Sequence, residues 1–175
     1  MSDALVSARL VLRPQRVSDA DALNAAYGDV ELMRYWSHAP HADVAETRAY
    51  LAERVGKGDW RTWSVTLAGD DAAIGLVAAG VKRPGVVEIG YLIIRAHWGQ
   101  GYAREAVSRV LDLLFRDEGV RRVFADTDPE NDNSNRLLKA LGFTLEGHLR
   151  GDWETHIGVR DTHLWGLLAS EWIAR

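Results

Sequence analysis

The sequence predicts an α/β (α+β) protein with a mixed, mostly antiparallel sheet and helices on both faces. Strands expected at 60–68, 72–81 and 86–95 follow one another through glycine-containing turns, which predicts antiparallel neighbours. A long helix and another strand at 122–126 come next. A strand–helix–strand unit makes a parallel pair, so the sheet must contain both kinds of pairing.

The N-terminal third supplies one strand and most of the short helices. The expected elements there are a strand at 8–13 and helices at 18–27, 29–35 and 43–55. Ser18 is the expected N-cap of the first helix. In the strand at 60–68, Trp63 and Val65 alternate with Ser64 and Thr66, which predicts a half-buried strand.

The long helix has one continuous apolar face. Residues spaced at the helical period make up that face: Ala103, Ala106, Val107, Val110, Leu111 and Leu114. Gly119 is the expected stop. The elements expected after 122–126 are a helix at 134–141, strands at 143–149 and 157–167 with a polar loop at 150–156, and a helical turn at 169–173.

Bulk properties exclude several classes of function. With 175 residues, 47% of them hydrophobic and 26% charged, the chain is expected to form one domain over residues 1–175. A net charge of −4 and a pI near 5.9 argue against binding to nucleic acid or an anionic membrane. The absence of cysteine excludes disulfides and acyl-cysteine chemistry. Neither a signal peptide nor a membrane span is visible, so a cytoplasmic location is expected.

A glycine-rich turn precedes the long helix and has the properties of an anion site. Its residues are Trp98, Gly99, Gln100, Gly101, Tyr102 and Ala103. Small residues let the backbone approach a ligand, and the unpaired N–H groups and dipole of a helix start favour a phosphate or pyrophosphate.

These residues resemble the acetyl-CoA signature of the GNAT superfamily of N-acetyltransferases, in which a strand leads into [R/Q]-x-x-G-x-[G/A] and a helix. The wording IGYLI and WGQGYAREA is similar to the RimJ/RimL-like branch, although Trp98 stands where Arg or Gln is frequent. A second segment about thirty residues further matches the same branch at Asn131, Ser134, Arg136, Leu138, Lys139, Gly142 and Phe143. The two motifs support each other, whereas a short glycine turn alone is weak evidence.

The resemblance implies a GNAT fold over essentially the whole chain, with acetyl-CoA as co-substrate. In that fold the parallel pair splays apart, the pantetheine arm pairs with a strand edge, and the pyrophosphate lies on the loop amides. The cofactor residues it implies are Leu92, Ile93, Ile94, Trp98, Gly99, Gln100, Gly101, Tyr102, Ala103, Arg104, Asn131 and Ser134. For Asn131 and Ser134, the alternative interpretation is helix capping.

The implied reaction moves acetyl directly to a primary amine, either a protein N-terminal α-amine or a small-molecule or aminoacyl amine. The ammonium must first lose a proton, and Glu88 is the candidate base, although a solvated strand residue would look the same. The resemblance implies that the backbone N–H of Ile93 donates a hydrogen bond to the oxyanion. It also implies that the Ser134 hydroxyl stabilises the leaving thiolate. Many GNAT proteins place a tyrosine acid where this chain has Leu138.

The acceptor site is expected between the early helices and the sheet. Its candidate residues are Trp36, His38, Trp63, Tyr91 and Trp153, and several tryptophans favour an enclosed pocket for a small amine. The histidines lack metal-ligand spacing, so no metal is predicted. We expect a monomer or homodimer.

Two other classes are weaker. One is an acyl-CoA-binding GNAT module without turnover, which the presence of Ser134 and Asn131 disfavours. The other is a Rossmann nucleotide binder, which the spacing excludes because Arg104 occupies the third small-residue position.

Overall fold

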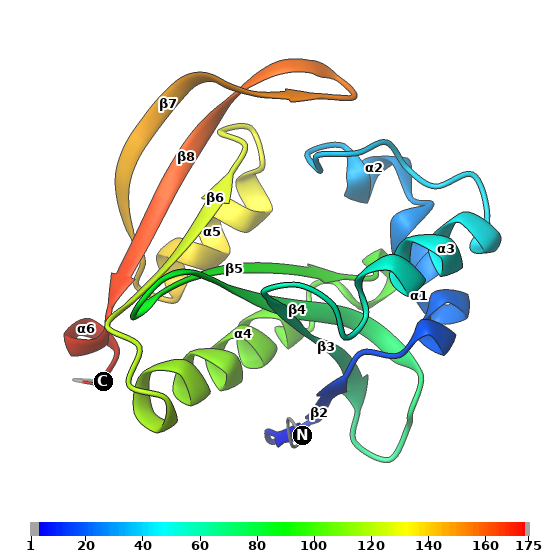
Figure 1. Ribbon diagram of the computed structural model, residues 1–175, viewed down its shortest axis with the longest axis horizontal. Helices are drawn as coiled ribbons and strands as arrows, with labels where there is room; N and C mark the ends of the chain where they lie inside the picture. The colour runs from blue at the N-terminus through cyan, green and yellow to red at the C-terminus, as the bar shows by residue number, and fades with distance from the viewer. Residues whose placement is uncertain (1–3, 174–175) are drawn as a thin grey trace.

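The computed structural model describes residues 4–173 and contains one mixed sheet. The eight strands lie in the order β1-β2-β3-β4-β5-β6-β8-β7 (Figure 1). Their bounds are Leu5–Val6 (β1), Leu10–Pro14 (β2), Trp60–Leu67 (β3), Ala73–Arg83 (β4), Val86–Ile93 (β5), Arg122–Thr127 (β6), Thr144–Thr155 (β7) and Gly158–Leu168 (β8). All neighbours pair antiparallel except β5 and β6, which pair parallel. The predicted mixed, mostly antiparallel sheet is therefore confirmed.

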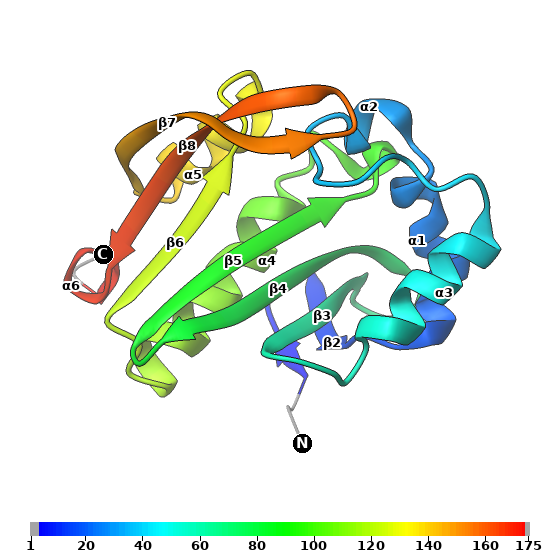
Figure 2. The same cartoon turned by 45° about the horizontal axis from the view of Figure 1, so that its top comes forward.

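Helices cover both faces of this sheet, as predicted (Figures 1 and 2). They are α1 (Ala20–Tyr27), α2 (Val30–Met33), α3 (Val44–Arg54), α4 (Tyr102–Asp112), α5 (Asp132–Ala140) and α6 (Ala169–Ile173). Buried residues of α4, α5 and α6 form one core cluster with the sheet. Those of α1, α2 and α3 form a second cluster against β4 and β5. Adjacent residues Leu76 and Val77 of β4 belong to different clusters, because successive side chains in a strand point to opposite faces.

Helix α4 buries the predicted apolar face. Its residues Ala106, Val107, Val110 and Leu111 are fully buried, as is Leu114 in the turn that follows. After Asp112 the helix widens into a π-helical turn, Leu113–Asp117, which ends before Gly119. This face fixes α4 across the sheet and thereby fixes the glycine loop at its N-terminus.

The parallel pair is short. Only Val86, Val87 and Glu88 of β5 are registered with β6, opposite Arg122, Val123 and Phe124. Strand β5 then runs on to Ile93 and β6 to Thr127, with no registered pairs between them. The strands diverge beyond this point (Figure 2). The fork leaves one backbone edge of β5 free for another partner.

Three predictions about local structure are wrong. Strand β3 is not half buried, because Ser64 (0% exposed) and Thr66 (2%) are covered as well as its apolar residues. Ser18 does not cap α1, since it lies in a 3-10 turn, Val17–Asp19, that precedes the helix. Residues 150–156 are not a loop, because β7 extends to Thr155 through a bulge and pairs with β8 up to Gly158.

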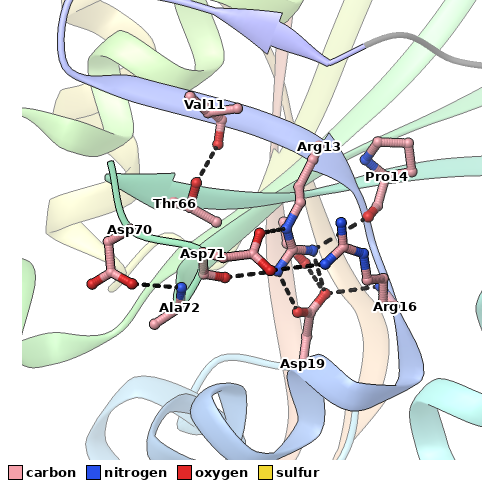
Figure 3. A network of polar contacts seen from close by, with 10 residues as sticks. Val11, Arg13, Pro14, Arg16, Asp19, Thr66, Asp70, Asp71 and Ala72 are labelled. Atoms are coloured by element: carbon pink, nitrogen blue, oxygen red, sulfur yellow. Dashed lines mark hydrogen bonds and ion pairs between the residues drawn. The ribbon is translucent and has the colours of Figure 1, made fainter. Parts of the chain in front are cut away.

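A buried ion pair explains how polar residues of β3 are accommodated (Figure 3). Arg13 and Asp19, each 6% exposed, form a two-bond pair with N–O distances of 2.7 and 3.0 Å. Ser64 donates to Asp19 at 2.7 Å, and Arg13 and Arg16 also bind the Asp71 carboxylate. Burial alone would raise the pKa of Asp19, but hydrogen bonds from Arg13, the Arg16 N–H and Ser64 outweigh it and hold that pKa below its usual value. The network ties β2 and α1 to β3 and the β3–β4 turn.

Candidate active site

A cavity of about 800 Å³ runs along the free edge of β5 to the start of α4. The predicted cofactor residues that line it are Leu92, Ile93, Trp98, Gly99, Gly101, Tyr102, Ala103, Arg104, Asn131 and Ser134. Two predicted residues, Ile94 and Gln100, are not among the lining residues. The Gln100 carbonyl instead accepts a hydrogen bond from Arg9 Nη1 at 3.0 Å.

The glycine loop presents backbone amides to this cavity. Gly99 and Gly101 have φ angles of 76° and 77°, a left-handed conformation that side chains disfavour. Gly101 is the N-cap of α4, and no side chain caps the helix. The N–H groups of its first turn therefore remain available for an anion at the cavity wall.

Two side chains hold this loop in place. Arg9 contacts Glu105 at 2.7 Å and lies 4.7 Å over the Tyr102 ring, in addition to its bond to the Gln100 carbonyl. Trp98 donates its indole N–H to the Ile93 carbonyl at 2.6 Å. The residue that departs from the usual family pattern thus fastens the loop to the end of β5.

The free edge of β5 has a definite backbone orientation. The N–H of Ile94 donates to the Ile74 carbonyl at 2.8 Å, so it faces β4. Strand alternation turns Leu92 the same way and turns Ile93 toward the fork. The expectation that backbone groups of Leu92 and Ile94 pair with the pantetheine arm is therefore wrong, whereas Ile93 has the required orientation.

A second cavity, of about 530 Å³, lies on the other side of the fork. Aromatic side chains form much of its wall: Tyr27, Tyr35, Trp36, Tyr50, Trp60 and Trp153. Both cavities are lined by Tyr35, Trp36, Tyr91, Asn131 and Ser134. The two spaces consequently meet where β5 faces the start of α5.

At this junction Tyr91 and Ser134 share a hydrogen bond of 2.7 Å between their hydroxyl oxygens. Burial raises the pKa of Tyr91 to about 12, although the Ser134 bond acts in the opposite direction. The phenol therefore stays protonated near neutral pH. Asn131 is the N-cap of α5 and accepts the Ser134 N–H at 3.3 Å. The sequence singled out each of these residues, but not the bond between Tyr91 and Ser134.

Four residues with carboxyl groups line the second cavity, namely Glu88, Asp126, Asp128 and Asp161, and the registered end of the parallel pair brings Glu88 and Asp126 together at the fork. Glu88, the predicted base, forms an ion pair with Lys82 at 2.7 Å. Asp126 lines the same cavity, and sequence reasoning missed it as a functional residue. The sequence offers one signal for Asp126. It is a carboxylate that follows the apolar residues of the strand at 122–126, and this strand is expected to pair in parallel with the strand before the glycine loop.

The remaining acceptor candidates separate into two groups. Trp36 and Trp153 line the second cavity, as expected for substrate contacts. Trp63 does not, because it is 1% exposed and packs in the core cluster that contains α4. His38 is not among the lining residues, and its ring centroid lies 5.1 Å from that of His41 and 6.2 Å from that of Tyr27. The assignments of Trp63 and His38 to the cavity lining are wrong.

Comparison with known proteins identifies the family. The model of the acetyltransferase (GNAT) domain matches residues 9–144. The chain belongs to the GNAT acetyltransferase family. An uncharacterized N-acetyltransferase of Bacillus licheniformis, p20, is 33% identical over 97% of this chain and 98% of its own length. A probable GNAT acetyltransferase structure from Chromobacterium violaceum has a TM-score of 0.89 at 27% identity, covering 97% of this chain and 88% of that one.

Spermidine N(1)-acetyltransferase of Vibrio cholerae is a more distant relative of this GNAT protein. It is 24% identical over 97% of this chain and 99% of its own. Its structure, solved in complex with CoA and spermine, has a TM-score of 0.82 at 23% identity and covers 95% of this chain and 99% of that one. This likeness shows the fold.

Two further properties concern residues 4–173. No group of three or more histidine, aspartate or glutamate side chains in that range is arranged to hold a metal ion. None of the helices described there combines the length and apolar character needed to cross a membrane.

Proposed function

We propose that this GNAT protein is an acetyl-CoA-dependent N-acetyltransferase of the RimJ/RimL-like branch that transfers acetyl directly to a small primary amine. The observation that carries the proposal is the meeting of two cavities at Tyr91 and Ser134. A thioester reaching this point along one cavity would meet an amine entering by the other. Such an arrangement permits direct transfer without a covalent enzyme intermediate.

The first cavity suits CoA along its whole length. The pyrophosphate would lie on the N–H groups that follow Gly99 and Gly101, and the pantetheine amides would run along the free edge of β5. In this arrangement the thioester would lie near Ile93 and Ser134. The Ile93 N–H, which faces the fork, would donate to the oxyanion of the tetrahedral intermediate.

The reaction must neutralise the ammonium of the acceptor before attack and stabilise the thiolate that leaves. A carboxylate at the fork would remove a proton from the incoming ammonium, because only the neutral amine has a lone pair for attack. Collapse of the intermediate breaks the carbon–sulfur bond and leaves negative charge on sulfur. The Ser134 hydroxyl would donate to this thiolate while Tyr91 donates to the Ser134 oxygen, which fixes the direction of the Ser134 hydrogen.

The second cavity favours a small acceptor over a protein terminus. Aromatic side chains from α1, α3, β3 and β7 surround it, and its volume of about 530 Å³ suits a small molecule. Aromatic rings and carboxylates are the groups that bind cationic amines. The relationship to a spermidine acetyltransferase supports an amine of this kind.

A thiol-release assay with acetyl-CoA tests the proposal against spermidine, spermine, free amino acids and N-terminal peptides. We expect turnover with at least one small amine and slower or no turnover with peptides. Tight CoA binding without turnover on any acceptor would support the binding-module alternative instead. Faster turnover of peptides than of every small amine would contradict the acceptor class.

A further inference from the structure

Two carboxyl groups, those of Glu88 and Asp126, meet at the point where the sheet forks. Glu88 is registered with Phe124 in the last parallel pair, and Asp126 follows two residues later on β6. Registered partners and residues two apart share a face, so both carboxyls lie on the side of the acceptor cavity. Both line that cavity, and β5 and β6 have no registered pairs beyond this point.

The two carboxyls have different surroundings. Glu88 forms an ion pair with Lys82 at 2.7 Å and its side chain is 19% exposed. Asp126 makes no ion pair with any residue in the range 4–173. The charged groups acting on Asp126 are Glu88 of β5 and Asp152 of β7, both acidic. Two cationic side chains of this region are paired with other carboxylates. Lys82 pairs with Glu88, and the Arg160 guanidinium pairs with Asp128 at 2.7 Å.

These surroundings raise the pKa of Asp126 above its usual value. Burial is the largest cause that raises the pKa of Asp126, followed by the charge of Glu88, with a side-chain hydrogen bond to Glu88 contributing further. A base accepts a proton more readily as its pKa approaches that of the donor, which suits Asp126 to an ammonium. The Glu88 carboxylate is instead engaged by Lys82 at 2.7 Å.

Building on the proposed function, we propose that Asp126, rather than Glu88, is the group that takes the proton from the acceptor ammonium. One N–H bond of the ammonium breaks and its proton passes to an Asp126 carboxylate oxygen, which leaves a neutral amine. The amine lone pair forms the bond to the thioester carbon, and the carbon–sulfur electron pair departs with sulfur. The thiolate takes the second amine proton, and Asp126 returns its proton to solvent through the cavity.

Glu88 is then a positioning residue. Its negative charge attracts the ammonium toward Asp126 and keeps the Asp126 carboxylate basic. The ion pair with Lys82 at 2.7 Å holds the Glu88 carboxylate in position at the fork. The two carboxyls thus have different predicted sensitivities to substitution, although they line the same cavity.

The test measures kcat/KM against pH for the full chain and for Asp126→Asn, Glu88→Gln and Lys82→Met, with an acceptor that the wild type turns over. We expect Asp126→Asn to lower kcat/KM by about 100-fold or more, since a positioned base contributes about that much. Glu88→Gln should retain about a tenth or more of the activity and move the acid limb to lower pH by about 1 unit, because it removes a neighbouring negative charge. Lys82→Met should move the limb the opposite way.

Affinity for CoA and the unfolding midpoint are measured for every variant, so that a folding defect is not read as a catalytic one. Loss of activity in Glu88→Gln with activity retained in Asp126→Asn would overturn the proposal in favour of Glu88. An unshifted acid limb in Glu88→Gln would overturn it even if Asp126→Asn did not fold. A wild type that turns over no amine instead contradicts the proposed function.

Discussion

The proposed cofactor cleft and the proposed acceptor cavity of this protein are built in different ways. Within the cleft, a short run from Trp98 to Arg104 at the end of β5 forms the proposed pyrophosphate site, while residues of the segments 31–36 and 130–137 line the rest. The cavity is lined by side chains that range from Gln15 to Thr162 and come from helices and strands on both sides of the fork. The proposed pyrophosphate site therefore depends mainly on local conformation, whereas the cavity depends on contacts between distant segments.

Because of this difference, we expect the two regions to tolerate substitution differently. Backbone amides bind a pyrophosphate whichever side chains surround them, so the loop tolerates a residue such as Trp98 at an unusual position. A wall of side chains changes its chemistry with each substitution. We expect variants in the two regions to fail in distinguishable ways.

The largest effect is expected from a contact on which the acceptor half depends. Asp19→Asn should lower the free energy of unfolding by about 3 kcal/mol, because it removes the buried carboxylate that pairs with Arg13 and leaves Arg13 only the exposed Asp71 as a carboxylate partner. Urea unfolding at neutral pH measures this loss. Asp21→Asn is the matched control, since Asp21 pairs with Arg48 at the surface and should cost less than about 1 kcal/mol.

The pH dependence of the same pair has a definite sign. The folded-state pKa of Asp19 is lowered, so its stabilising contribution is present above about pH 4 and is lost as the pH falls through the lowered value. The stability difference between wild type and Asp19→Asn should therefore narrow in acid. A difference that stays constant from neutral to strongly acidic pH contradicts this assignment.

A single change in the loop should disable the cofactor half alone. Gly101→Asp places a side chain at a φ of 77° and a carboxylate at the expected pyrophosphate, which should weaken CoA binding by roughly 100-fold or more. Calorimetric titration with CoA measures the affinity. Gly119→Asp introduces comparable backbone strain at a φ of 66° near the far end of α4, with open space around it. Gly119→Asp should leave CoA affinity close to the wild-type value. Equal losses of CoA affinity in both variants would refute the assignment of the glycine loop as the pyrophosphate site.

The junction of the two halves should affect the chemical step. Ser134→Ala should lower kcat by about 10- to 100-fold, the value of a hydrogen bond to a charged group, with little change in the KM for acetyl-CoA. Asn131, not Ser134, caps α5, so the helix start is retained. Tyr91→Phe should have a smaller effect, about 2- to 10-fold. Steady-state kinetics with an unchanged kcat in Ser134→Ala would remove it from the mechanism.

The cofactor half was largely predictable from the sequence because its signals are local. Glycines before an amphipathic helix predict the turn and the helix start, which the positions of Gly99 and Gly101 confirm, and the same residues carry the prediction of an anion site. What periodicity could not supply was the backbone direction at Leu92 and Ile94, which depends on the pairing of β5 with β4.

The acceptor half was predicted less well because its residues come together only through the fold. Trp63 was assigned to the pocket by residue type, but its position in β3 turns it to the α4 face. Asp126 was missed because its neighbour Glu88 is far away in sequence. Ser64 was expected at the surface, since nothing local indicates that it donates to the buried Asp19.

The smallest predicted effect comes from the same substitution, Trp to Phe, made once in the cofactor cleft and once in the acceptor cavity. Trp98→Phe keeps a ring but removes the indole N–H that binds the Ile93 carbonyl, which should raise the KM for acetyl-CoA by about 2- to 5-fold. The KM for the amine should not change. Trp153→Phe alters the acceptor cavity wall and should show the reverse pattern. If both variants raise the same KM, then the cleft and the cavity are coupled through the fork. In that case the two sites cannot be altered independently, although one is built from a local segment and the other from distant segments.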